Sequence, residues 1–170
     1  MNVEAARAAH QALLKSGVNF VACLPDSAFQ ELYVPLSADP EITYVQVASE
    51  NDGVGVCMGA WLGGMKPALL VENTGFTLGT YALLRGPMAF GVPMLLLISH
   101  RGDLGDERWF SVPFGWGTKP LLDLRFVHQL NEFANLFGRR LWCSRVLCEC
   151  RKRRGQCRPE AARVDARRGQ

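Results

Sequence analysis

Four short segments of this 170-residue sequence carry side chains that are suited to contact a ligand. They supply carboxylates, hydroxyls, amides, an imidazole and a guanidinium group, which can donate or accept hydrogen bonds. Each segment comes directly after a short, almost wholly apolar run. The four segments are Pro25-Asp26-Ser27, Ala48-Ser49-Glu50-Asn51, Asn73-Thr74-Gly75-Phe76 and His100-Arg101-Gly102-Asp103. They can form one ligand site if the apolar runs are strands of one sheet.

The apolar runs predict β-strands, because they are short, rich in branched side chains and bounded by Gly, Pro or polar residues. The predicted strands span residues 18–24, 42–47, 67–72 and 93–99. Between them, apolar residues at helical spacing predict helices over residues 4–16, 26–36, 49–62 and 78–90. Asp26 or Ser27 can cap the second of these helices and Ser49 the third. Gly86-Pro87 predicts a break within the fourth.

Strands that alternate with helices, and that are continuously apolar, predict an α/β fold. We expect an open, mostly parallel sheet with helices on both faces. In such sheets ligands bind beyond the carboxyl ends of the strands, where the four polar segments would lie.

The common nucleotide-binding and hydrolase motifs are absent from the sequence. There is no Walker loop, no Gly-x-Gly-x-x-Gly after a predicted strand, no His-Glu-x-x-His and no Gly-x-Ser-x-Gly. His10, His100 and His128 lie in three different contexts, so no metal cluster is expected from the histidines.

The polar segments and their neighbours form an ordered set of motifs. In chain order these are Leu24-Pro25-Asp26-Ser27, Ser49-Glu50-Asn51-Asp52-Gly53-Val54-Gly55, Gly59-Ala60, Leu62-Gly63-Gly64, Glu72-Asn73-Thr74-Gly75, Gly91-Val92-Pro93-Met94-Leu95-Leu96-Leu97-Ile98 and Arg101-Gly102. This set resembles the pyrimidine-binding domain of thiamine-diphosphate enzymes, over about residues 5–123. It resembles in particular sulfopyruvate decarboxylase alpha subunits and phosphonopyruvate decarboxylases.

The resemblance implies a catalytic role for Glu50. In that family a glutamate hydrogen-bonds ring nitrogen N1′ of the cofactor's aminopyrimidine, and Glu50 falls on its position. The shared proton favours the imino form of the exocyclic amine, which then removes the proton from the thiazolium carbon. The cofactor carries the difficult chemistry, and the protein orients and polarises it. The plainer alternative for Glu50 is a solvated glutamate in the first turn of a helix.

The resemblance implies further site residues. We expect Pro25, Asn73, Thr74 and Gly75 beside the cofactor, and Asp26, Ser27, His100 and Arg101 beside the substrate. The segment Asn73-Thr74-Gly75 is expected as a polar loop under the pyrimidine ring, and its alternative is a plain turn. Asp26 and Ser27 have a helix cap as their alternative. Arg101 suits sulfonate or phosphonate oxygens, although a loop arginine is usually just solvated.

Half of a thiamine-diphosphate site is missing from the sequence. The diphosphate-binding domain of such enzymes has a Gly-Asp-Gly run and a downstream Asn that hold magnesium. The run from Arg101 to Asp106 has neither the flanking strand nor the Asn. The resemblance therefore implies a hetero-oligomer with a diphosphate-binding, beta-type subunit that holds the magnesium, without which this chain is inactive.

The predicted function is that of a subunit of a thiamine-diphosphate-dependent decarboxylase that acts on a small anionic 2-oxoacid. The enzymatic alternative is another thiamine-diphosphate enzyme half, of the phosphonopyruvate decarboxylase or acetolactate synthase type. The remaining alternatives are a non-catalytic truncated product and a basic-tailed binding module.

The net charge of +3 hides a division of the chain at residue 124. Residues 1–123 carry 7 Lys and Arg against 12 Asp and Glu, whereas residues 124–170 carry 12 against 4. We expect the pyrimidine-binding domain over 1–123 and an atypical, basic, Cys-rich tail over 124–170 that contains a helix at 125–137. The basic cluster at 151–154 could bind an anionic partner. The Cys spacing contains no Cys-x-x-Cys pair, so zinc is not expected.

Translation of GC-rich DNA out of the original frame explains this tail best, because it would enrich Arg, Cys, Gly and Trp together. The sheet could then lack its last edge, and nucleic acid is not the expected partner. We expect no membrane span, because no apolar run is long enough, and no signal peptide. The thiols clustered in the tail suggest a reducing compartment, so we expect a cytoplasmic protein.

Overall fold

The computed structural model describes residues 1–103, 106, 108–123 and 147–148. The helix predicted at 125–137, the basic cluster at 151–154 and the predicted domain boundary after residue 123 lie outside the described residues. No helix among the described residues is both long and apolar enough to cross a membrane.

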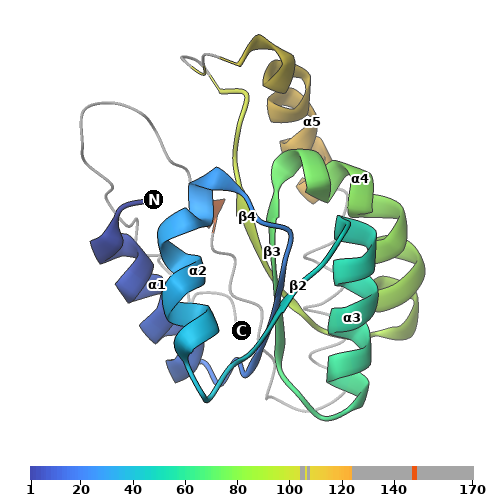
Figure 1. The fold of residues 1–170 in the computed structure, drawn as a ribbon. Helices are drawn as coiled ribbons and strands as arrows, with labels where there is room; N and C mark the ends of the chain where they lie inside the picture. Colours follow the sequence, from blue (N-terminus) through green and yellow to red (C-terminus); the bar gives the residue numbers. More distant parts are fainter. Residues whose placement is uncertain (104–105, 107, 124–146, 149–170) are drawn as a thin grey trace, which may run out of the picture.

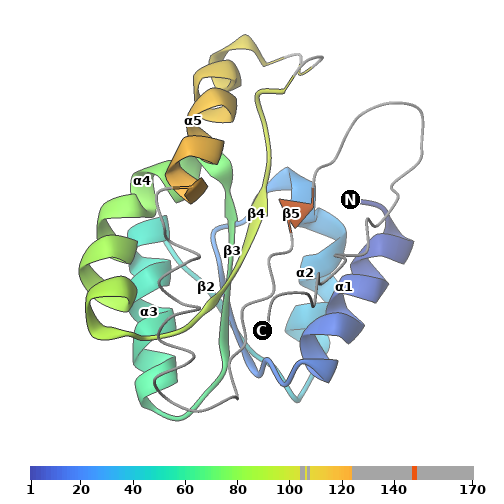
Figure 2. The same cartoon turned by 180° about the vertical axis from the view of Figure 1, so that it is seen from behind.

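The described residues form a parallel β-sheet with helices on both faces (Figures 1 and 2), which confirms the predicted fold class. The strands are β1 (Phe20–Cys23), β2 (Thr43–Gln46), β3 (Pro67–Glu72), β4 (Leu95–Ser99) and β5 (Leu147–Cys148). Their order in the sheet is β2-β1-β3-β4-β5. β5 consists of two residues that pair in parallel with Ile98 and Ser99 of β4. The four predicted strands are confirmed, with ends that differ by up to two residues.

The helices divide into two layers. They are α1 (Val3–Lys15), α2 (Gln30–Ala38), α3 (Glu50–Leu62), α4 (Asn73–Leu83) and α5 (Val112–Asp123). α1 and α2 cover one face of the sheet and α3 and α4 the other (Figures 1 and 2). α5 packs against α4 near the carboxyl ends of the strands.

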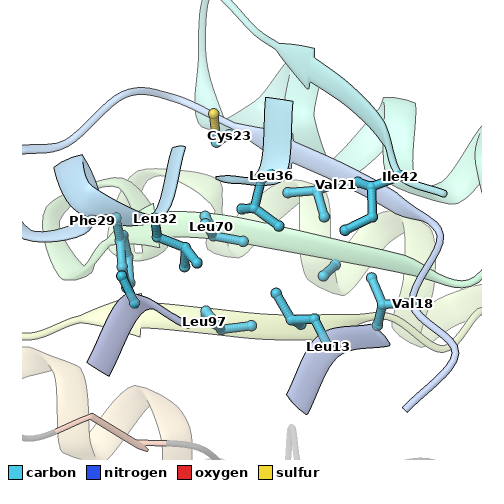
Figure 3. Close-up of a cluster of buried hydrophobic side chains, with 12 residues drawn as sticks. Leu13, Val18, Val21, Cys23, Phe29, Leu32, Leu36, Ile42, Leu70 and Leu97 are labelled. Carbon is cyan, nitrogen blue, oxygen red and sulfur yellow. The ribbon is translucent and has the colours of Figure 1, made fainter. Parts of the chain in front are cut away.

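Each face of the sheet has its own core, because alternate strand residues point to opposite sides. Val21 and Leu70 join the core under α1 and α2, with Leu13 and Leu36 from those helices (Figure 3). Strand neighbours with the opposite orientation join the core under α3 and α4. These are Phe20, Ala22, Leu69, Val71 and Ile98. The continuous apolar runs of the sequence therefore reflect strands that are buried on both faces.

Caps fix the beginnings of two helices. Asn2 caps α1 by accepting a 2.8 Å hydrogen bond from the amide of Ala5. Ser49 caps α3, as predicted, by accepting one of 3.2 Å from the amide of Asp52. Asp26 caps a short 3-10 turn, Ser27–Phe29, which leads into α2.

The predicted loop at Asn73-Thr74-Gly75 is wrong. α4 begins at Asn73, five residues before the predicted start, so all three residues lie in its first turn. Asn, Thr and Gly together favour turns. Tertiary contacts of Asn73 and Gly75 override that preference here, as described below. The predicted break is confirmed as a π-helical turn, Leu84–Met88, which contains Gly86 and Pro87.

Candidate functional site

The strand order reverses direction between β1 and β3. The chain passes from β1 through α2 to β2 on one side, and then through α3 to β3 on the other. Such a switch point leaves a crevice at the carboxyl ends of the strands, where ligands bind in open α/β sheets. A cavity of about 340 Å³ lies there. It is lined by Leu24, Pro25, Asp26, Ser27, Glu50, Glu72, Thr74 and Arg108.

The lining includes five of the nine residues that the sequence nominated for the site. These five are Pro25, Asp26, Ser27, Glu50 and Thr74. Asn73 and Gly75 flank Thr74 in the first turn of α4, and both are buried. His100 and Arg101 are half-buried and do not belong to the lining. Glu72 and Arg108 line the cavity, although the sequence nominated neither.

Glu50 is the first residue of α3, and its side chain crosses to α4. Its Cγ and carboxylate press on the position where a Cβ of Gly75 would stand, so any larger residue at 75 would collide with Glu50. One turn further along α4, Gly79 passes the Cβ of Glu50 with ordinary van der Waals spacing. The glycine at 75 thus lets the Glu50 carboxylate lie at the cavity, against the first turn of α4.

Asp26 is fixed by hydrogen bonds on both sides of its carboxylate. Oδ1 accepts from the amide of Ala28 at 3.1 Å, and Oδ2 accepts from the hydroxyl of Ser99 at 2.5 Å. The amide of Asp26 itself donates to the hydroxyl of Tyr33 at 2.6 Å. These bonds connect the segment after β1 to the end of β4.

Glu72 is the last residue of β3, so it lies between the two strands that the Asp26–Ser99 bond connects. Burial raises the pKa of the Glu72 carboxyl, and the nearby negative charge of Asp26 raises this pKa further. A 3.1 Å hydrogen bond from the Thr74 hydroxyl to Oε1 and the charges of Arg101 and Arg108 act in the opposite direction. The net effect is a raised pKa. A charged residue that ends an otherwise apolar strand was the signal that could have nominated Glu72.

Asn73 is fully buried and connects α4 to the segment after β4. Its amide nitrogen donates to the carbonyl of Arg101 at 2.9 Å and to the hydroxyl of Thr118 at 3.0 Å. Its amide oxygen accepts from the backbone N–H of Arg101 at 3.2 Å. These three bonds hold the first turn of α4 in place, which explains why the expected loop is helical.

Asp106 organises the segment that follows β4. Its carboxylate accepts hydrogen bonds from the amides of Gly102 at 2.9 Å and Arg108 at 3.0 Å, which lower its pKa. Arg101 Nε lies 3.2 Å from Asp106 Oδ2, forming an ion pair without hydrogen-bond geometry. Arg101 is therefore directed at Asp106, and Arg108 is the arginine that reaches the cavity.

The site is therefore an acidic cavity with one arginine among its lining residues. Asp26, Glu50 and Glu72 supply carboxyl groups, and Ser27 and Thr74 supply hydroxyls. These groups can hold a neutral or cationic heteroaromatic ring through its nitrogens and can bind or release protons. Among the described residues, no group of three or more His, Cys, Asp or Glu side chains could hold a metal ion.

A switch-point cavity in a parallel sheet, with a glutamate at the start of α3, is the arrangement that the resemblance to pyrimidine-binding domains of thiamine-diphosphate enzymes implies, and comparison with known proteins supports that class. No protein-family model matches the chain. It is 38% identical over 121 residues to the sulfopyruvate decarboxylase subunit alpha of Methanococcus maripaludis, covering 71% of this chain and 72% of the relative. The corresponding subunit of Methanocaldococcus jannaschii is 32% identical over 117 residues, covering 69% of each protein.

The phosphonopyruvate decarboxylase of Streptomyces viridochromogenes is 30% identical over 91 residues, which are 54% of this chain and 23% of the relative. The chain belongs to the family of sulfopyruvate decarboxylase alpha subunits. It is a decarboxylase subunit of the thiamine-diphosphate-dependent type. The designation of these relatives as alpha subunits implies that such proteins work with a partner subunit.

Proposed function

We propose that this chain supplies the pyrimidine-binding half of the active site in a two-subunit 2-oxoacid decarboxylase. The observation that carries the proposal is the position of Glu50, at the start of α3, beside the switch-point cavity and directly against Gly75. In the thiamine-diphosphate class, a glutamate of this kind holds N1′ of the aminopyrimidine.

The residues around Glu50 suit an aromatic ring. Gly75 has no side chain, which leaves space for the Glu50 carboxylate. Pro25 and Thr74 line the cavity together with Glu50. Glu50 would share a proton with N1′, while Asn73 would hold the first turn of α4 in register beneath the ring. When bound, thiamine diphosphate supplies the electron sink that lets a 2-oxoacid lose carbon dioxide.

The substrate would lie on the side of the cavity formed by the segment after β1. Asp26 and Ser27 line this side, and Asp26 is held rigidly by Ser99 and Ala28. Arg101 would act as a positioning residue, because its ion pair with Asp106 fixes the segment that carries Arg108. His100 remains a proposed substrate neighbour on the grounds of its place directly after β4.

The partner we propose is a beta-type subunit that binds the diphosphate and magnesium. The 170 residues contain no Gly-Asp-Gly motif with a downstream Asn, so the groups that hold the diphosphate end of the cofactor would come from outside this sequence. The complete enzyme would then be a hetero-oligomer with its active site between two unlike subunits. The substrate class is a small 2-oxoacid with a second anionic group, as in sulfopyruvate or phosphonopyruvate.

The test is to combine the full chain with a candidate beta-type subunit, thiamine diphosphate and Mg²⁺. Carbon dioxide release is then measured from sulfopyruvate, phosphonopyruvate and pyruvate. Glu50→Gln should lower kcat by at least about 100-fold, because it removes a proton-transferring group. Calorimetry on the same complex should show weaker thiamine diphosphate binding.

Glu31→Gln is the matched control, since Glu31 also lies in the first turn of a helix but is exposed and does not line the cavity. This variant should behave like the wild type. Full activity in Glu50→Gln would refute the role of Glu50. Failure of the reconstituted complex to release carbon dioxide from any of the three acids would refute the proposed function.

A further inference from the structure

Glu72 lines the cavity at the end of β3, the strand that lies between β1 and β4. It is half-buried and faces charged groups from each surrounding element. Asp26 follows β1, Glu50 begins α3, Arg101 follows β4 and Arg108 precedes α5. The function proposed above assigns no role to Glu72.

The charge of the cavity creates a difficulty for an anionic substrate. Three carboxyl groups line it against one guanidinium, that of Arg108. A 2-oxoacid with a second anionic group adds further negative charge to a partly buried space, where like charges repel more strongly than they do in water. Uptake of one proton by a lining carboxyl removes one negative charge and creates one hydrogen-bond donor.

Hydrogen bonding indicates which carboxyl takes the proton. Both oxygens of Asp26 already accept hydrogen bonds, so a proton there would displace a donor. Glu50 is reserved for the cofactor by the proposed function. Glu72 accepts one hydrogen bond, from Thr74 to Oε1, and among the described residues no donor points at Oε2. Oε2 is therefore the position at which a proton can be added without breaking an existing bond.

We propose that Glu72 is a substrate-binding acid, which takes up a proton when the anionic 2-oxoacid binds and donates a hydrogen bond to it. This inference rests on the proposed function, since it needs an anionic ligand in the cavity. The proton comes from the solvent, the substrate remains an anion, and the Glu72 carboxylate becomes a neutral carboxylic acid. The raised pKa of Glu72 supports the assignment, and an anion in the cavity would raise it further.

The first test counts protons during binding. The ligand is 3-sulfolactate, the 2-hydroxy analogue of sulfopyruvate, which has no oxo group to react. It is titrated calorimetrically into the complex of the full chain, partner, thiamine diphosphate and Mg²⁺ in two buffers of different ionisation enthalpy. The pH is set above the pKa of Glu72 in the ligand-free complex and below neutrality. At this pH we expect ligand binding to take up about one proton per ligand.

Glu72→Gln should abolish this uptake, while the neutral amide still allows the ligand to bind. Glu31→Gln should leave the uptake unchanged. Binding without proton uptake in the wild type overturns the inference, and so does undiminished uptake in Glu72→Gln. If carbon dioxide is released from sulfopyruvate but no proton is taken up, the inference fails and the proposed function stands.

A second measurement does not need the partner subunit. Carbon-13 NMR of the full chain, with labelled glutamate carboxyls, follows the titration of Glu72. Glu72 should titrate above the ordinary range of a glutamate side chain, and Asp26→Asn should lower its midpoint because a neighbouring negative charge is lost. Titration of Glu72 within or below that ordinary range overturns the inference.

Discussion

Ser99 donates a 2.5 Å hydrogen bond to Oδ2 of Asp26, and this bond joins the end of β4 to the segment after β1 across the end of β3. Both residues belong to strands or segments that approach the cavity, yet they are 73 positions apart in the sequence. The bond fixes the carboxylate of Asp26 toward the sheet, beside Glu72.

Replacing Ser99 by alanine should therefore loosen Asp26 and destabilise the fold. A hydrogen bond to a charged group contributes about 1.5–3 kcal/mol, so Ser99→Ala should lower the free energy of unfolding by about 2 kcal/mol. Urea denaturation measures this change. Ser37→Ala is the control, because Ser37 is exposed and bonds only to the carbonyl of Val34. If both variants lower the free energy of unfolding equally, the Ser99–Asp26 bond contributes no more to stability than an exposed serine bond.

Gly75→Ala should displace the Glu50 side chain. The new Cβ would collide with the Glu50 carboxylate, which can move only by turning away from the first turn of α4. Since the carboxylate is the end of a flexible, half-buried side chain, the cost should lie at or below the lower end of the range of about 1–3 kcal/mol that overpacking of a core causes. Urea denaturation should detect the loss, and the reconstituted enzyme should lose activity as it does in Glu50→Gln.

Two further variants test the cause of the Gly75→Ala effect. In Glu50→Ala, the colliding atoms are gone, so adding Gly75→Ala should cost much less than it does in the wild type. Gly55→Ala should not destabilise α3, since a Cβ there meets nothing within 4 Å. If Gly75→Ala lowers the free energy of unfolding equally in the Glu50→Ala background, the new Cβ collides with a residue other than Glu50.

Asn73→Ala should be among the more destabilising single substitutions at the site. It removes three hydrogen bonds from a fully buried side chain and leaves polar groups of Arg101 and Thr118 without their partner. Each buried polar group left unsatisfied costs about 1–3 kcal/mol, so a total loss of about 3 kcal/mol is expected. Hydrogen exchange should show faster exchange of the Arg101 amide, and unchanged exchange there would contradict this account.

The pH dependence of stability should have opposite signs at Glu72 and Asp106. The pKa of Glu72 is raised in the folded state, so the folded protein binds its proton more tightly and loses stability as the pH rises through this range. Glu72→Gln should therefore be more stable than the wild type at neutral pH, with an advantage that disappears below the ordinary glutamate pKa.

The pKa of Asp106 is lowered by its backbone hydrogen bonds, so its contribution to stability is present at neutral pH and disappears as the pH falls through its folded pKa. Asp106→Asn should therefore be less stable than the wild type at neutral pH and equal to it in acid. Thermal melts over a pH series measure both effects. Melting curves that shift in parallel across the series would contradict both assignments.

The sequence was sufficient to predict the architecture, because the information lies in local patterns. Apolar runs such as residues 67–72 predict buried strands, and residues with a strong capping preference, such as Ser49, mark helix starts. The order of the motifs was also sufficient to predict the enzyme class and to place Glu50 at the start of a helix beside the cavity.

The details that were missed depend on contacts between distant residues. Local preference favours a turn at Asn73-Thr74-Gly75, but bonds from Asn73 to residues 28 and 45 positions away hold that segment as a helix. Likewise, nothing in the sequence shows that Arg101 pairs with Asp106 and leaves the cavity to Arg108. The raised pKa of Glu72 arises from burial and from Asp26, which is remote in the chain.

The hydrogen bonds of Asn73 have a consequence for ligand affinity. They join the first turn of α4, the segment after β4 and α5 into one rigid corner before any ligand arrives. A ligand that binds against Thr74 therefore need not immobilise this wall, and the entropy of ordering it is already lost during folding. The buried amide of Asn73 thus makes this wall of the cavity preorganised, and a ligand binds more tightly because it does not have to order the wall.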